Sequence, residues 1–163
     1  MPHTRQLYDD GWFFTEFSRW LRLQEELDSI REGLDIENLD YIIHKYNNRN
    51  ICKFMLIEEK RFMKDLPFTQ RDTFSILDSV LRRLDGVIVS TARGDKLFKY
   101  FGFHLIQFEK TCPDDGRIFL DKREISKHDL IRFLRFEAPD NWYVSYFDKI
   151  ITTNTSKPPP QNR

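Results

Sequence analysis

Five charged residues lie close together in the second half of the chain and could support metal-dependent chemistry. They are Asp114, Asp115, Asp121, Glu124 and Lys127. Nucleases that use a divalent cation gather carboxylates around the ion, commonly with a lysine nearby. The spacing here differs from the usual strand-borne acidic-x-Lys pair, because Asp121 is followed directly by Lys122 and Arg123. The run from Pro113 to Gly116 is equally typical of a solvated turn. A metal-dependent nuclease is therefore the third of three functional hypotheses.

Other reactive side chains lack the neighbours that their chemistry requires. Tyr146 and Lys149 have the Tyr-x-x-Lys spacing of a nucleophile for single-stranded DNA transfer, but His104 stands alone where a histidine pair is usual. Cys52 and Cys112 are far apart and form no metal-ligand motif. The six glycines form no nucleotide-binding loop. We expect no cofactor, no metal ion and no catalytic residue, which favours a non-enzymatic protein.

A basic stretch in the second half could bind nucleic acid. Its candidate contact residues are Arg117, Lys122, Arg123, Lys127, Arg132 and Arg135. Arg132 and Arg135 share a face of a predicted helix, and the rings of Phe119 and Trp142 could stack on bases. Residues 109–137 nevertheless carry seven acidic side chains against seven basic ones. Nucleic-acid binding is the second hypothesis.

The first amphipathic segment carries more large rings than one packing seam requires. Trp12, Phe13, Phe14, Phe17 and Trp20 lie within nine residues of one another. Tryptophan and other rings dominate the binding energy of many protein interfaces. The alternative is that this helix covers a sheet of its own chain. The first hypothesis takes Trp12, Phe14, Phe17 and Trp20 as contacts with a protein partner or a second copy, in a binding or regulatory module.

Composition restricts the class of protein and its partners. The 163 residues carry 26 basic and 26 acidic side chains, so no net charge draws the chain to nucleic acid or an anionic membrane. Aromatic residues make up 15%, which is typical of a packed core. No apolar run approaches the ~20 residues of a membrane span, and no signal-peptide pattern opens the sequence. We expect no membrane partner, reduced cysteines, and a cytoplasmic or else nuclear location.

Hydrophobic spacing predicts a helical half over residues 12–85. Apolar residues recur at helical intervals over 12–32, and a similar pattern predicts a helix at 36–46. The segment 51–64 is also compatible with a strand, but its length and flanking charges favour a helix. Thr69 and Asp72 resemble a capping box for a helix that ends at Gly86. About four helices are thus expected before the sheet begins.

The remainder of the chain, residues 86–151, is predicted to form a roughly four-stranded, mainly antiparallel sheet. Its strands are expected at 87–89, 103–108, 117–121 and 142–151. One or two helices cover it, at 95–101 and after Ser126. This order of elements resembles ferredoxin-like split βαβ units. The complete prediction is an α+β protein with a single domain over 1–151 and a disordered, proline-rich tail over 152–163.

Overall fold

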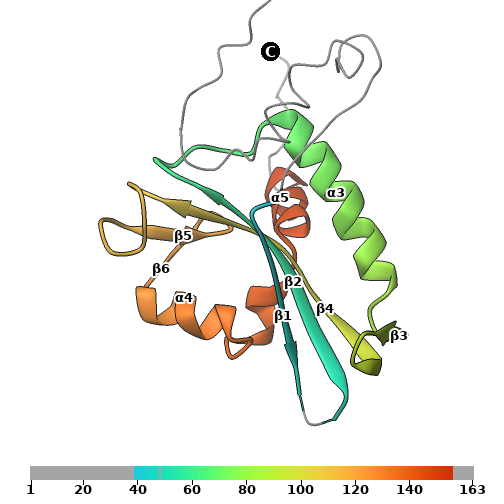
Figure 1. Cartoon of the computed structure of the whole chain (residues 1–163). Coiled ribbons are helices and arrows are strands. Elements are labelled where there is room, and N and C mark those ends of the chain that lie inside the picture. Colours follow the sequence, from blue (N-terminus) through green and yellow to red (C-terminus); the bar gives the residue numbers. More distant parts are fainter. Residues whose placement is uncertain (1–38, 48, 156–163) are drawn as a thin grey trace, which may run out of the picture. The chain divides into compact units, whose positions relative to one another are not determined.

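The structure is a computed structural model that describes residues 39–47 and 49–155, with side chains up to Ile151. The chain divides into two compact units, residues 1–36 and 37–163, and every described residue belongs to the second. Figure 1 shows the elements in chain order: β1 (Tyr41–Tyr46), β2 (Ile51–Lys60), α3 (Phe68–Arg83), β3 (Ile88–Thr91), β4 (Gly94–Phe108), β5 (Ile118–Leu120), β6 (Arg123–Ile125), α4 (Lys127–Leu134), the 3-10 helix η2 (Asp140–Tyr143) and α5 (Tyr146–Thr155).

The strands of this unit form one mixed sheet. Its order is β1-β2-β4-β5-β6, and β3 pairs with the first residues of β4. β2 and β4 run parallel, whereas all other pairs are antiparallel. Parallel neighbours need a crossover connection, commonly a helix. Helix α3 lies within that connection, so the two longest strands become neighbours in the middle of the sheet.

Helices cover both faces of this sheet, α4 on one and α3 with α5 on the other (Figure 1). Successive side chains of a strand point to opposite faces. Along β4, Ile106 and Phe108 therefore join the cluster beneath α4, which includes Phe133. Phe103 and Leu105 join the cluster beneath α3 and α5. The near-continuous apolar run in β4 is explained because both of its faces are buried.

The edge of β4 opposite β2 is left open between its two antiparallel partners. β3 pairs with Gly94–Leu97, and β5 pairs with Ile106–Phe108. The chain passes from the α4 face to the α5 face beside this gap, between Tyr143 and Tyr146. Gly102 permits the passage: a Cβ there would lie 3.0 Å from the backbone oxygen of Tyr143 and 3.1 Å from Cα of Ser145.

The predicted helical first half is wrong for the residues that the structure describes. Segments 36–46 and 51–64 were expected to be helices, but strands β1 and β2 occupy most of them. Leu39, Ile42, Ile43 and Tyr46 have helical spacing, yet pairing between the two strands decides their conformation, for example Ile43 opposite Met55. Asn47 closes the connection by accepting hydrogen bonds from the backbone amides of Arg49 and Ile51.

The second half also departs from the prediction in two places. Residues 95–101 belong to strand β4 and not to a short helix, because they continue the pairing with β2 and β3. Residues 142–151, expected to be the last strand, instead form the end of η2 and most of α5. α5 continues through Thr155, so this helix extends past residue 151. The arrangement is a six-stranded mixed sheet, not the expected four-stranded one.

Several local predictions are confirmed. Helix α3, the strand near 87–89, the strand over 103–108 and the return strand after Gly116 are present. The capping box predicted at Thr69 and Asp72 is wrong, because α3 begins at Phe68 after Pro67 and no side chain makes a capping hydrogen bond there. Ser126 caps α4 as expected, since its Oγ accepts a hydrogen bond from the amide of Asp129 at 3.0 Å. The coarse expectation of mixed helices and strands holds. Within the part of the chain that the structure describes, no helix combines the length and hydrophobicity needed to cross a bilayer. The segment 12–32 lies outside the described residues.

Candidate functional site

The turn between β5 and β6 places a carboxylate against the edge of β4. Asp121 and Lys122 form this two-residue turn with φ angles of 49° and 72°. Positive φ at both central residues is the geometry of a type I′ hairpin, whose twist matches that of the strands. Aspartate tolerates this region better than most residues, because its short polar side chain can bond locally. The turn thereby directs Asp121 toward the open edge of β4.

Asp121 takes the place of a missing strand partner for Leu105. Its backbone amide donates to the Leu105 carbonyl at 2.8 Å, and its carboxylate Oδ1 accepts from the Leu105 amide at 2.9 Å. One residue thus satisfies both backbone polar groups of Leu105 where neither β3 nor β5 reaches. Because an unpaired buried amide costs roughly 1–3 kcal/mol, this pairing is a structural requirement of the open edge.

His104 is fully buried behind Asp121, and both of its ring nitrogens face oxygen atoms. Nδ1 lies 2.8 Å from Asp121 Oδ2, and Nε2 lies 2.6 Å from the carbonyl oxygen of Phe101. A carboxylate and a carbonyl can only accept hydrogen bonds. Both ring nitrogens therefore face hydrogen-bond acceptors of the fold. Phe133 packs edge-on against this ring, with 4.8 Å between centroids.

Lys149 of α5 completes the charged group. Its Nζ lies 2.7 Å from Asp121 Oδ2 and 3.1 Å from the carbonyl oxygen of Trp142. Burial alone would raise the pKa of Asp121, but the positive charges and hydrogen bonds of His104 and Lys149 outweigh it and lower that pKa. The carboxylate therefore stays ionised, and hydrogen bonds from Leu105, His104 and Lys149 compensate its charge.

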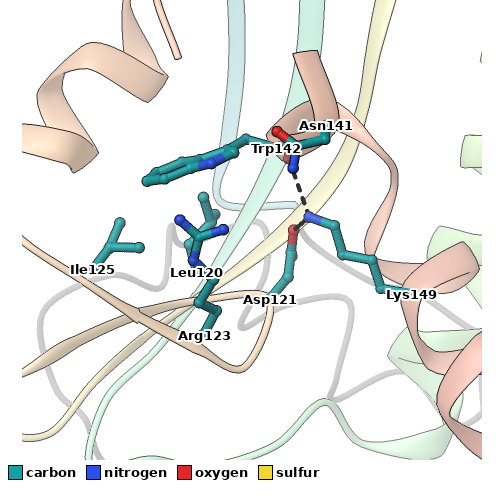
Figure 2. Close-up of a pocket in the computed structure, with 7 residues that line it drawn as sticks. All are labelled: Leu120, Asp121, Arg123, Ile125, Asn141, Trp142 and Lys149. Carbon is teal, nitrogen blue, oxygen red and sulfur yellow. Dashed lines mark hydrogen bonds and ion pairs between the residues drawn. The ribbon is translucent and has the colours of Figure 1, made fainter. Parts of the chain in front are cut away.

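A small cavity opens beside this group. Its volume is about 80 Å³, and it is lined by Leu120, Asp121, Arg123, Ile125, Asn141, Trp142 and Lys149. Figure 2 shows the Arg123 guanidinium beneath the Trp142 ring and the Lys149 ammonium reaching Asp121. The guanidinium carbon lies 4.2 Å from the ring centroid. β6, η2 and α5 thus bring two cations and an amide to one cavity.

The residues predicted to contact nucleic acid are mostly paired with carboxylates. The pairs are Arg117 with Glu109, Lys122 with Asp65, Lys127 with Asp114, Arg132 with Asp129 and Arg135 with Glu137. Arg123 differs from the other five, because it makes no ion pair with any described residue and stacks on Trp142 instead. The predicted basic surface thus carries alternating positive and negative charges, and Arg123 differs because it forms no ion pair with a described residue.

The carboxylates considered for a metal site serve different purposes. Asp114 pairs with Lys127, and Asp115 accepts hydrogen bonds from the loop amides of Thr111 and Cys112. Among the described residues, no three histidine, cysteine or acidic side chains come together as a metal site would require. Tyr146 and Lys149 lie on a helix and not on the predicted strand; Tyr146 is buried in the core beneath α3.

Two further buried polar groups were not identified from the sequence. Asp78 of α3 accepts hydrogen bonds from Tyr100 Oη at 2.8 Å and Ser145 Oγ at 3.0 Å, and pairs with Arg82 at 2.6 Å. It thereby ties α3 to β4 and to the start of α5. Glu58 of β2 pairs with Lys60 at 2.6 Å, and burial raises the pKa of Glu58 to about 7.

The predicted partner-binding rings, Trp12, Phe14, Phe17 and Trp20, lie outside the described residues. Within the described part, the outward face of α3 carries an apolar row. Helical spacing predicts Val80 and Leu84 on the core face of this helix, and that prediction is wrong, because both are exposed. Phe68, Ile76 and Val80 are 79%, 59% and 51% exposed, and Leu84 continues the row beyond the helix end. A shallow groove lined by Ser75, Ile76, Ser79, Val80 and Arg83 runs along it. The four-residue spacing of Ile76, Val80 and Leu84 was the sequence pattern that could have indicated this row.

Comparisons with protein-family models, with curated proteins and with solved structures each found no match.

Proposed function

We propose that this chain is a non-enzymatic binding module whose protein partner is a second copy of itself, with α3 as the contact surface. The observation that carries the proposal is the apolar row on the outward face of α3. Phe68, Ile76, Val80 and Leu84 lie four or eight residues apart, so they follow one line along the helix. Scattered exposed apolar residues need no explanation, but a row on one helix face is the pattern of an interface.

Two charges support a second copy as the partner: Asp72, which lies on this line between Phe68 and Ile76, and Arg83, which lies beside it. Asp72 lies near the start of α3 and Arg83 at its end, and neither side chain forms an ion pair within the described residues. In an antiparallel pair of identical helices that cross near residue 78, Ile76 of one copy faces Val80 of the other. Asp72 of each copy then lies close to Arg83 of the other, so two-fold symmetry forms this contact twice. Such a two-fold interface is self-complementary in both apolarity and charge.

Small side chains at the centre allow the two helices to approach closely. Ser75 and Ser79 line the groove between the larger residues of the row. Packed helices lie roughly 8–10 Å apart, and small residues at the crossing permit the shorter distances. The large side chain of Ile76 or Val80 from one copy can then enter the groove of the other.

The buried charges support a role in binding and not in catalysis. His104 is 0% exposed, and both of its ring nitrogens lie within hydrogen-bond distance of oxygen atoms of the fold. A general base must reach the proton that it removes. His104 and Asp121 instead satisfy each other and the edge of β4. The unpaired thiols of Cys52 and Cys112 support the cytoplasm as the place where the module acts.

The test is the solution mass of the full chain from micromolar to millimolar concentration. We expect a concentration-dependent dimer that Ile76→Glu with Val80→Glu converts to a monomer of unchanged circular dichroism. The matched control is Ile131→Glu, which alters a residue of α4 that is 50% exposed and lies outside the row. The control should dimerise like the parent chain.

A charge exchange tests the antiparallel arrangement itself. Asp72→Arg and Arg83→Asp should each raise the dimer dissociation constant about tenfold or more, because each places like charges together. The double exchange should restore dimerisation. A chain that stays monomeric at all concentrations would refute the proposal. If the chain is monomeric and Phe68 is protected from hydroxyl-radical oxidation, another segment of the same chain covers the apolar row. That result would also refute the proposal.

A further inference from the structure

The small cavity beside the β5–β6 turn differs from the α3 surface in its chemistry and in its elements. We propose that it binds a small carboxylate, held by the Arg123 guanidinium and attracted by Lys149. The inference is independent of dimerisation, because none of the cavity residues lies on α3. It assigns a ligand class to a part of the fold that the self-association does not use.

The charges around the cavity favour an anion. Among the side chains that line the cavity, Lys149 and Arg123 contribute two positive charges, and Asp121 contributes one negative charge. The Asp121 carboxylate already accepts hydrogen bonds from Leu105, His104 and Lys149, so its charge is compensated by groups of the fold. Arg123 has no carboxylate partner among the described residues. The excess of positive charge is thus concentrated on the side chains that line the cavity.

Trp142 holds Arg123 in place before any ligand arrives. Its ring lies 4.2 Å from the guanidinium carbon (Figure 2), and stacking of this kind leaves the N–H groups at the rim of the guanidinium available to donate. The planar fork matches the two oxygens of a carboxylate. A fixed guanidinium loses less conformational freedom on binding than a mobile one would.

The rest of the lining favours a carboxylate with a short apolar group. The side-chain amide of Asn141 can donate a hydrogen bond, whereas Leu120 and Ile125 present only hydrocarbon. A volume of about 80 Å³ holds a group the size of acetate or propionate. A phosphate would need donors around all of its oxygens, and the apolar lining supplies none on its side.

The probe is sodium acetate, titrated into the ¹⁵N-labelled full chain while sodium chloride keeps the ionic strength constant. We expect saturable shifts of the Trp142 indole N–H and the Arg123 Nε–H, with a dissociation constant in the millimolar range. Arg123→Gln should weaken binding about tenfold or more. The matched control is Arg117→Gln, because Arg117 also stacks on a ring, that of Phe119 at 5.5 Å, but lies outside the cavity.

Several outcomes of this titration would contradict the proposal. Shifts that grow linearly with acetate, or an equal loss in the Arg117→Gln control, would mean that no specific site exists. Inorganic phosphate that binds more tightly than acetate would overturn the carboxylate assignment. Arg123→Lys keeps the charge without the fork and should bind with intermediate strength. The titration is repeated on the monomeric Ile76→Glu, Val80→Glu chain, where unchanged binding separates this site from the α3 contact.

Discussion

The Asp121 carboxylate lies 2.8 Å from Nδ1 of His104, and both side chains are buried at the open edge of β4. The pair is more than a local ion pair. Asp121 also bonds both backbone groups of Leu105 and receives Lys149 from α5. One side chain therefore holds the hairpin, the central strand and the last helix together.

Replacement of this carboxylate should be among the most damaging single changes. Asp121→Asn removes the negative charge that pairs with Lys149, and it directs amide hydrogens at either His104 or Leu105. Breaking a buried pair in this way costs about 3–5 kcal/mol of unfolding free energy. Urea denaturation followed by circular dichroism measures the loss. The control, Asp114→Asn, breaks an exposed pair with Lys127 and should cost less than about 1 kcal/mol.

Glu58 should make stability fall as the pH rises from 5 to 8. Burial raises its pKa to about 7 in the folded chain, so the folded state holds a proton that the unfolded state has released above about pH 4.3. Stability therefore falls by roughly 2 kcal/mol between pH 5 and 7, and the fall levels off above pH 7, where the folded state also loses the proton. Glu58→Gln should flatten this part of the stability profile.

The matched variant for this profile is Glu109→Gln. Hydrogen bonds from Arg117 lower the pKa of Glu109, so its titration lies at acidic pH and its removal should leave the slope between pH 5 and 8 unchanged. Denaturation midpoints at several pH values provide the comparison. A slope that survives Glu58→Gln would show that another group takes up the proton.

Asp78 and Tyr100 should behave as one unit in a double-mutant cycle. Asp78→Ala leaves the hydroxyls of Tyr100 and Ser145 buried without their acceptor and should cost about 3 kcal/mol, whereas Tyr100→Phe should cost about 1 kcal/mol. The double variant should lose less than the sum of the two single losses, because a phenylalanine ring has no hydroxyl that needs the carboxylate. Strictly additive losses, measured in urea, would contradict the coupling.

Gly102 should tolerate a methyl group far less well than Gly94. The two have almost the same backbone angle, with φ of +88° and +89°, so alanine at either site costs about 1 kcal/mol of backbone strain. Gly94 has nothing within 4 Å of the added carbon, whereas Gly102 meets Tyr143 and Ser145 backbone atoms at 3.0 and 3.1 Å. Gly102→Ala should therefore cost about 2 kcal/mol more. Thermal melting of the two variants compares them, and equal losses would remove the argument for close passage.

The parts of the fold that local sequence predicts are those with their own start and stop signals. Helix α4 has its Ser126 cap, and α3 ends before Gly86 as expected. Strands β1 and β2 were mistaken for helices because isoleucine pairs at positions such as Ile42 and Ile43 fit either period. The conformation of β1 depends on its pairing with β2, and that of β2 depends on the parallel contact with the distant β4, which leaves no local pattern. α5 likewise depends on the burial of Tyr146 beneath α3.

The candidate site was visible in the sequence only as separate residues. Asp121 was considered as a metal ligand, Arg123 as a phosphate contact, and His104 and Lys149 as parts of a nucleophile motif. Their convergence requires the two-residue turn at Asp121 and the passage of the chain past Gly102, and neither could be placed before the sheet order was known. The two residues between the strand-like runs of β5 and β6 were a local indication of a tight hairpin turn at Asp121.

The parallel neighbours at the centre of the sheet have a consequence for biosynthesis. β2 is complete at Lys60, but β4 ends only at Phe108, after the crossover and a short hairpin. A nascent chain therefore exposes one long apolar strand before its main partner leaves the ribosome. Contacts between distant segments slow folding, and an unpaired strand edge invites association with other chains. The interval between these two strands is when the growing polypeptide most depends on chaperones.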